Sequence, residues 1–479
     1  MNFLMVLYLL GYILLCVGGL MIVPIIVALI YGESCVGAFL ITAAIGIIPG
    51  LIIIHKKPKN KIFHLREGYV ITALSWIVIS LVGALPFVIS GAIPNYIDAL
   101  FEIISGFTTT GASILPEVES LPKSIIFWRS FTHWIGGMGV LVFLLALLPL
   151  SGGSNMNLMK AESPGPQVGK LVPKVRSTAT ILYTIYLGIT VIEIIALLIA
   201  RMSLFDTLTI TFGSVGTGGF GVRNDSCASY TITQQVIITI FMIASGINFN
   251  AYFYIVFRKF KKALQIEEVW VYLAFILISI ILIAVDINSM FPSFWQSIQQ
   301  AAFQVGSVIT TTGYSTCDYN NWPSFSKNII ILLMFSGACA GSTGGGIKVS
   351  RIIILFKSIV KEVKHVLHPQ SISTVRMDGK TVAHETMRST NVFIMSYIMI
   401  FVVSVLILSI EGYPFETNFT AVLATFNNIG PGLDLVGPAA NFSFYSPISK
   451  LVMCFDMLAG RLEIFPMLIL FSKHTWSRF

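Results

Sequence analysis

Ten long apolar segments constrain the fold of this sequence more than any other feature. A helix needs about 20 apolar residues to cross the hydrocarbon core of a membrane. The ten segments occupy residues 3–30, 35–54, 68–90, 124–150, 177–200, 231–257, 269–290, 328–360, 391–410 and 446–471. We therefore predict an all-α integral membrane protein that crosses the membrane many times.

Composition excludes a soluble protein. Hydrophobic residues make up 55% of the chain and charged residues only 11%, whereas soluble domains carry about 25% charged residues. The N-terminal segment is almost wholly apolar and lacks a basic start. A cleaved signal peptide has a basic start and an apolar stretch of about 7–15 residues. We therefore expect the first segment to be an uncleaved spanning helix.

The Lys and Arg residues predict the orientation of the chain. They gather in the connections 56–66, 160–176, 258–262 and 348–388. Short connections rich in Lys and Arg stay on the cytoplasmic side, so we predict that these four connections and both termini are cytoplasmic. The same side chains suit anionic membrane lipid. Basic and aromatic residues do not interleave as on a base-stacking surface, so nucleic acid is not an expected partner.

Four shorter, semi-polar segments lie between alternate spans, at residues 97–113, 205–221, 294–315 and 415–433. Each begins like a helix and ends in Gly with Thr or Asn, and each is too short to cross a membrane. A half-helix that enters the membrane and returns as a loop fits this pattern. Non-helical backbone at membrane depth is tolerated only inside protein or around water. We therefore expect the four segments to line a cavity.

The four segments are copies of one repeat. The run Phe101 to Gly111 and the run Phe303 to Gly313 carry Phe, Ser and Thr-Thr-Thr-Gly at the same offsets. The other two segments match more loosely. The glycines that end the four segments are matched with one another at the repeat period, and they are Gly111, Gly218, Gly313 and Gly430. We expect four pseudo-repeats of helix, pore helix, filter loop and helix around a central pore, after an N-terminal pair of transmembrane helices. The predicted boundaries are 1–66 for the N-terminal pair and 67–176, 177–265, 266–380 and 381–479 for the repeats.

Four such loops around one axis have the chemistry of a cation filter. Backbone carbonyl oxygens replace the hydration shell of potassium in potassium channels, and glycine supplies the dihedral angles that aim carbonyls inward. Pore helices whose C-terminal ends face the axis favour cations. Helix packing is the alternative explanation for the glycines, and their repeat period disfavours it. The candidate potassium ligands are Thr109, Thr110, Gly111, Gly216, Thr217, Gly218, Thr311, Thr312, Gly313, Asn428, Ile429 and Gly430.

With these motifs the chain resembles the Trk/Ktr/HKT superfamily of potassium transporters, and within it the bacterial TrkH type, over essentially its full length. The resemblance implies potassium uptake through a gated, channel-like pore in the bacterial inner membrane. It implies that Gly111 accompanies potassium transport, whereas serine at that position accompanies sodium transport. It also implies a homodimer and a peripheral cytosolic partner of the TrkA type that binds nucleotides. No organic cofactor is expected in this chain.

The segment 328–360 is too long for a single crossing, and its glycine-rich middle is expected to break the helix. The break is either a simple hinge or, by resemblance, an intramembrane loop that obstructs the pore. Arg461 lies within the last predicted span, where an ionisable side chain is costly and by default functional. It either pairs with Glu463 or Asp456 or, by resemblance, faces the pore near this loop. The candidate gate residues are Gly341, Ser342, Thr343, Gly344, Gly345, Gly346 and Arg461.

Two other classes of protein compete with a channel. A symporter driven by protons or sodium would need a carboxylate buried in the membrane, for which Glu193 and Glu463 are the candidates. Arg129 and His133 are better explained by interfacial ion pairs than by a proton path. A membrane enzyme would need His with Asp or Glu on facing helices. The sequence lacks such a cluster, so we predict no catalytic residue and no enzymatic activity.

Overall fold

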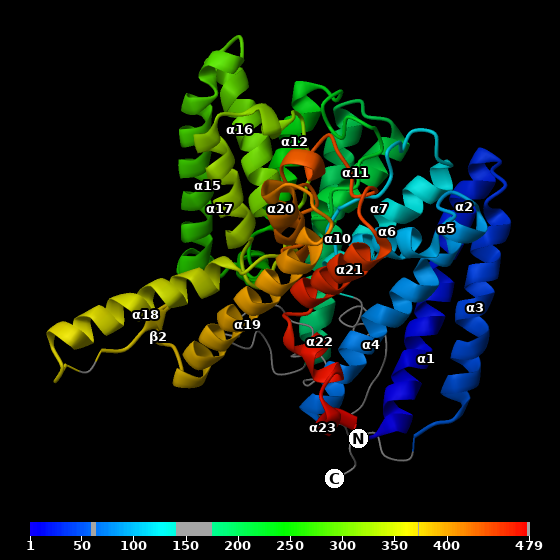
Figure 1. Cartoon of the computed structure of the whole chain (residues 1–479), viewed down its shortest axis with the longest axis horizontal. Helices are drawn as coiled ribbons and strands as arrows, with labels where there is room; N and C mark the ends of the chain where they lie inside the picture. Colours follow the sequence, from blue (N-terminus) through cyan, green and yellow to red (C-terminus); the bar gives the residue numbers. More distant parts are fainter. Residues whose placement is uncertain (59–63, 140–174, 372, 477–479) are drawn as a thin grey trace.

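The computed structural model describes residues 1–58, 64–139, 175–371 and 373–476. Residues 59–63 of the predicted basic connection 56–66 and residue 372 of the connection 348–388 lie outside these residues, and two further predictions do so to a larger extent. The second half of the predicted span 124–150 is one, and most of the basic connection 160–176 is the other. The N-terminus and residues 473–476, the last that are described, lie at the same end of the molecule (Figure 1).

The N-terminal extension is a helical hairpin that stands at one side of the bundle (Figure 1). Helices α1 (Phe3–Leu20) and α2 (Ile22–Tyr31) form the first arm, and α3 (Val36–His55) forms the second. The arms pack closely because small residues face each other. A Cβ built on Gly46 would lie only 2.9 Å from the carbonyl oxygen of Leu14. Small residues allow spanning helices this close approach.

Each of the four repeats begins with a helix long and apolar enough to cross a membrane. These helices are α4 (Leu65–Gly83) continued by α5 (Leu85–Ile89), α10 (Val175–Ile199), α15 (Glu267–Asp286) and α19 (His384–Ser409). Their outer faces expose large apolar side chains, such as Leu277 at 61% and Met399 at 68%. Such faces suit contact with lipid rather than water.

A short pore helix follows each of these spans, as the sequence predicted. The pore helices are α6 (Tyr96–Phe107), α11 (Leu204–Gly216), α16 (Phe294–Ile309) and α20 (Phe415–Phe426). The polar side chains of Asn95, Ser203 and Ser293 cap the first three by accepting a hydrogen bond from a backbone N–H in the first turn. Such caps satisfy N–H groups that a helix leaves unpaired.

The second helix of each repeat is short or broken. These helices are α7 (Lys123–Gly137), the pair α12 (Ile232–Ser245) and α13 (Phe249–Val256), the pair α17 (Ser324–Ser336) and α18 (Val349–Leu367), and the pair α21 (Pro447–Arg461) and α22 (Phe465–Leu470). The break between α17 and α18 is the one predicted in 328–360.

The predicted spans over 231–257 and 446–471 are each divided into two helices in the structure. Helices α12 and α13 meet at an angle of 93°, at a junction that contains Gly246 and Asn248. Between α21 and α22, Glu463 and Ile464 have φ angles of +63° and +67°, which end a right-handed helix. In the described residues, six helices are long and apolar enough to cross a membrane, or seven if the bent pair counts as one span.

The remaining elements are small. Two short strands, β1 (Arg376–Met377) and β2 (Lys380–Thr381), pair antiparallel after α18. The short α-helices are α14 (Phe260–Leu264) and α23 (Lys473–Trp476). The short 3-10 helices are η1 (Asn288–Met290), η2 (Tyr319–Asn321) and η3 (Asp434–Val436). The chain is thus an all-α, multi-pass membrane protein.

Candidate functional site

The four pore helices end in the same backbone conformation. Each is followed by a Thr or Asn with a left-handed φ angle and, two residues later, by a glycine with a positive φ angle. The φ angles are +56° at Thr109, +56° at Thr217, +58° at Thr311 and +56° at Asn428, then +80° at Gly111, +79° at Gly219, +90° at Gly313 and +100° at Gly430. We call residues 109–111, 217–219, 311–313 and 428–430 the ring loops.

The second ring loop differs from the sequence prediction by one residue. The sequence analysis matched Gly218 with Gly111, whereas the backbone gives Gly219 the equivalent φ angle. The predicted residue Gly216 is the last residue of α11, where a Cβ would lie 2.5 Å from the carbonyl oxygen of His133. Aligning Thr217 with Thr109, as a pattern of Thr or Asn, any residue and Gly, would have found Gly219.

The ring loops close into a ring in the order of the repeats. Each glycine of positive φ lies against a carbonyl oxygen of the next loop. A Cβ on Gly111 would overlap the carbonyl oxygen of Gly218, one on Gly219 that of Thr312, one on Gly313 that of Ile429, and one on Gly430 would lie 2.8 Å from that of Thr110. Only glycine fits these positions, for both its backbone angles and its size.

The carbonyl oxygens of the ring loops have no hydrogen-bond donor within the described part of the chain. The Thr and Asn side chains of the loops are fully buried. In each loop, by contrast, one backbone N–H group donates a hydrogen bond to a carbonyl oxygen of the preceding pore helix. Thr110, Gly218, Thr312 and Ile429 each donate to the carbonyl five residues earlier, at 2.7–2.8 Å. Because more than about 90% of buried backbone carbonyls are paired in proteins, this concentration of free oxygens calls for water or a cation.

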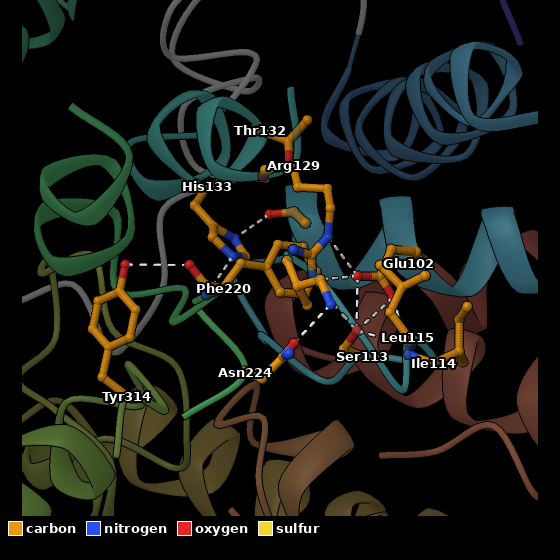
Figure 2. A network of polar contacts seen from close by, with 12 residues as sticks. Glu102, Ser113, Ile114, Leu115, Arg129, Thr132, His133, Phe220, Asn224 and Tyr314 are labelled. Atoms are coloured by element: carbon orange, nitrogen blue, oxygen red, sulfur yellow. Dashed lines mark hydrogen bonds and ion pairs between the residues drawn. The ribbon is translucent and has the colours of Figure 1, made fainter. Parts of the chain in front are cut away.

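A buried ion pair supports the first ring loop from behind. The guanidinium of Arg129 on α7 lies 2.6 Å from the carboxylate of Glu102 on α6, and both side chains are almost wholly inaccessible. The same carboxylate accepts hydrogen bonds from the Ser113 hydroxyl and the Ile114 N–H, each at 3.0 Å. Figure 2 shows Ser113 and Ile114 beside the Arg129–Glu102 pair. Arg129 is therefore buried behind the loop rather than at the interface.

His133 and Phe220 connect the first loop to the second and third (Figure 2). The His133 Nδ1 lies 2.8 Å from the Gly106 carbonyl, and its Nε2 accepts from the Phe220 N–H at 3.2 Å. This pairing assigns the proton to Nδ1. The Arg129 guanidinium lies 4.1 Å from the centre of the Phe220 ring, and the Tyr314 hydroxyl donates to the Phe220 carbonyl. His133 thus has a structural role here, and not that of an interfacial pair.

The loop between α17 and α18, residues 337–348, lies against the third ring loop. The Gly345 N–H donates to the Thr311 hydroxyl at 2.6 Å, and a Cβ on Gly344 would lie 2.8 Å from the Thr310 carbonyl oxygen. On its other side the Gly341 carbonyl accepts from the Phe249 N–H at the bend between α12 and α13. We call residues 337–348 the intramembrane loop.

Arg461 joins this loop to the first repeat. Its guanidinium donates to the Thr343 carbonyl at 2.7 Å and to the carbonyls of Gly136 and Gly137 at 2.6 Å and 2.7 Å. Of the alternative partners considered for Arg461, Glu463 pairs with Arg351 and Asp456 accepts from Ser404. The structure therefore brings Arg461 and the predicted gate segment together.

Comparison with known proteins agrees with this architecture. The family model TrkH, described as a cation transport protein, matches residues 37–478. This chain belongs to the TrkH family. It is 36% identical to the Trk system potassium uptake protein TrkH of Escherichia coli K12, over 99% of this chain and all of that protein. It is 34% identical to the Trk system potassium uptake protein TrkG of the same strain, over 95% of each chain.

A solved structure of a TrkH family member has the same fold. The crystal structure of the potassium transporter TrkH from Vibrio parahaemolyticus superposes on all of this chain with a TM-score of 0.89, at 31% identity. The whole length of both chains is covered. The all-α membrane fold predicted from the sequence is confirmed.

Glu268 is a site residue that the sequence analysis of this TrkH family member missed. Its carboxylate, at the start of α15, accepts from the N–H groups of Ala340 and Ser350 at 2.6 Å and 3.0 Å, and from the Asn248 amide at 3.2 Å. Glu268 thus connects the intramembrane loop and the first turn of α18 to the bend after α12. A carboxylate at the start of a span resembles an ordinary interfacial residue, so the sequence carries no signal for this role.

The candidate coupling carboxylates lie in different settings. Glu193 on α10 is fully buried and accepts a hydrogen bond from the Ser214 hydroxyl of α11 at 2.5 Å. Its second oxygen has no hydrogen-bond partner among the described residues. Glu463 is partly exposed and paired with Arg351, so its charge is already compensated.

Proposed function

We propose that this chain takes up potassium across the bacterial inner membrane through a gated, channel-like pore whose selectivity filter is formed by the ring loops. The closed ring of buried carbonyl oxygens without donors carries the proposal. Such oxygens replace the hydration shell of potassium in channel filters. The names of the TrkH and TrkG relatives, which are potassium uptake proteins, support potassium as the ion.

The electrostatics of the ring loops favour a cation without any fixed negative charge. Each loop follows the C-terminal end of a pore helix, which carries a partial negative charge from the helix dipole. No Asp or Glu occurs within the four ring loops. Dehydrated potassium would therefore be held by dipoles alone, which suits binding weak enough for rapid release.

The intramembrane loop and Arg461 form the proposed gate. The contacts of the loop with Thr311, and those of Arg461 with Thr343 and with α7, support an obstruction next to the ring. The positive charge of Arg461 would lower the occupancy of cations there. Deletion of residues 341–345 should raise basal potassium flux. Unchanged flux in a folded deletion variant would contradict the gate.

Ion flux through the purified protein, reconstituted in liposomes, tests the proposed function. Gradients of potassium, rubidium, sodium and lithium are imposed in turn, and uptake is measured for each ion. We expect potassium and rubidium flux well above sodium and lithium flux, with reversal at the potassium equilibrium potential. Equal flux for all four ions would refute selectivity by the ring loops.

A symporter is the second candidate, because Glu193 is a buried carboxylate with an unpaired oxygen. Such residues serve as coupling sites in membrane transporters. Potassium flux that appears only with an added proton or sodium gradient, and that is lost in Glu193→Gln, would favour symport. Flux without such a gradient would exclude it.

We further propose that both termini are cytoplasmic, that the chain forms a homodimer and that a cytosolic TrkA-type subunit that binds nucleotides docks on the cytoplasmic end. The basic connections 258–262 and 348–388 support this orientation, as do the N-terminus and residues 473–476, which lie at the same end of the molecule (Figure 1). Cysteine labelling from either side of sealed cells, at positions introduced near each terminus, tests it.

A further inference from the structure

A groove of about 750 Å³ lies between α15, α18 and the segment that leads into the β1–β2 hairpin. It lies outside the ring loops and the intramembrane loop. Helix α18 projects sideways from the bundle, with the hairpin beneath it (Figure 1). The groove opens between these two elements and the first turns of α15.

The floor of the groove is apolar and reaches membrane depth. It is lined by Val271 and Phe275 from α15 and by Ile353 and Phe356 from α18. Phe275 lies eight residues after Glu267, where the apolar span of α15 begins, which corresponds to about 12 Å along a helix. The floor therefore extends from the polar boundary into the hydrocarbon layer.

The rim of the groove is basic. Lys357, Lys361 and Lys364 follow one another on a single face of α18, and Arg376 faces them from the hairpin segment. Lys357 is already engaged, since its ammonium lies 2.6 Å from the Glu267 carboxylate and donates to the Arg376 carbonyl.

The other three cations of the rim are free to bind an anion. No carboxylate of the described residues lies within ion-pair distance of Lys361, Lys364 or Arg376. Lys364 and Arg376 are exposed, and Lys361 is half-buried. A cluster of unpaired cations directly above an apolar floor is therefore present at the membrane boundary.

We propose that this groove is a binding site for an anionic phospholipid. The acyl chain lies on the floor formed by Val271, Phe275 and Phe356, and the phosphate group pairs with Lys361, Lys364 and Arg376. Clusters of Lys and Arg at the end of a spanning helix attract anionic headgroups. A zwitterionic phospholipid would bring a cation of its own beside the phosphate and so carries no net negative charge, and a free anion would leave the floor uncovered.

Native mass spectrometry of the full-length, delipidated protein in detergent tests the headgroup contact. Phosphatidylglycerol and phosphatidylcholine with identical acyl chains are titrated separately. We expect the triple variant Lys361→Gln, Lys364→Gln, Arg376→Gln to lower the affinity for phosphatidylglycerol by roughly tenfold or more and to lower the affinity for zwitterionic phosphatidylcholine much less. These substitutions lie on the rim and spare the apolar core.

The matched control removes the same charge next to the groove. Lys259, Lys261 and Lys262 are exposed, lie shortly before α15 and do not line the groove. Their triple replacement by Gln should leave phosphatidylglycerol binding unchanged. Equal losses in the two triple variants would mean general surface attraction and would overturn the proposal.

A second variant tests the acyl floor while keeping every cation. Val271→Phe narrows the groove and should weaken phosphatidylglycerol binding, and excess inorganic phosphate should fail to displace the lipid. Displacement by phosphate would indicate a free-anion site and refute the lipid. A change in the monomer to dimer ratio of the rim variant, with lipid affinity unaltered, would indicate a second copy instead. Because no ion gradient is used, these results do not depend on the proposed transport function.

Discussion

At the residue scale, the glycines of the ring loops meet two separate requirements. Gly111 has a positive φ angle and leaves no room for a Cβ beside the Gly218 carbonyl. Gly218 lacks a positive φ angle, and a Cβ there would overlap the His133 ring. The first glycine is needed for the backbone that aims carbonyls, whereas the second is needed for packing. Substitutions at the two positions should therefore have different consequences.

Gly111→Ser should reduce ion selectivity. The added side chain forces the first and second ring loops apart, so the carbonyl oxygens no longer match dehydrated potassium. We expect the ratio of potassium to sodium flux in liposomes to fall by about tenfold. Gly188→Ser is the matched control, because a Cβ at Gly188 meets no atom within 4 Å. An unaltered ratio in folded Gly111→Ser protein would contradict the proposed filter.

The one-residue offset in the second ring loop can be tested directly. Gly219→Ala places a side chain at a φ angle of +79° and against the Thr312 carbonyl oxygen of the third ring loop. The backbone angle alone costs roughly 1 kcal/mol or more, and the contact moves the two loops apart, so we expect altered ion selectivity in assembled protein. Gly218→Ala instead collides with His133 and should lower the yield of folded protein. If only Gly218→Ala altered ion selectivity, Gly218 rather than Gly219 would be the equivalent of Gly111, as the sequence analysis predicted.

At the element scale, the pore helices are held to the helices behind them by buried polar groups. Glu102 and Arg129 join α6 to α7, and Glu193 and Ser214 join α10 to α11. Glu268 joins α15 to the intramembrane loop and to the bend after α12. In a bilayer no water competes for these groups, so each carboxylate fixes the distance between the elements that it connects.

Glu102→Gln should destabilise the protein strongly, because it leaves the Arg129 charge buried without a counter-charge. Breaking a buried pair in this way costs about 3–5 kcal/mol, measured as a loss of unfolding free energy in detergent. Asp206→Asn is the control, since its partner Arg223 is 39% exposed and exposed pairs contribute about 0–1 kcal/mol. Similar losses in both variants would show that the buried pair has no special role.

At the scale of the whole molecule, the ring forms only when all four repeats are assembled. Each ring-loop glycine contacts a carbonyl of the next repeat, and Gly430 of the last repeat returns to Thr110 of the first. Arg461 extends this closure, because one side chain of the fourth repeat binds the third repeat at Thr343 and the first at Gly136. Its hydrogen bonds therefore depend on the relative placement of three repeats.

Arg461→Ala should raise potassium flux several-fold under the proposed gate. The substitution removes a positive charge beside the ring and releases Thr343 from α7. Flux in liposomes at equal protein density measures the change. Arg461→Lys keeps the charge but cannot make all the contacts of the planar guanidinium, so an intermediate flux is expected. Flux that is unchanged or lower in well-folded Arg461→Ala would argue against this role.

The sequence by itself determined the membrane class, the four pore helices and the positions of three of the four ring-loop glycines. Short stretches of sequence predict these features, through the length of the apolar runs and the Thr-Thr-Thr-Gly motif of repeats one and three. The break in 328–360 was also predictable, because glycine disfavours helix wherever it occurs.

Only the tertiary structure decided the features that depend on contacts through space. The role of Gly219 follows from the third ring loop, whose Thr312 carbonyl leaves no room for a Cβ. The partner of Arg129 lies 27 residues away on another helix, and Glu268 binds groups 72 and 82 residues further along the chain. Local propensity and hydrophobicity carry no information about such pairings, because their energy arises only when the repeats have packed and water has been excluded.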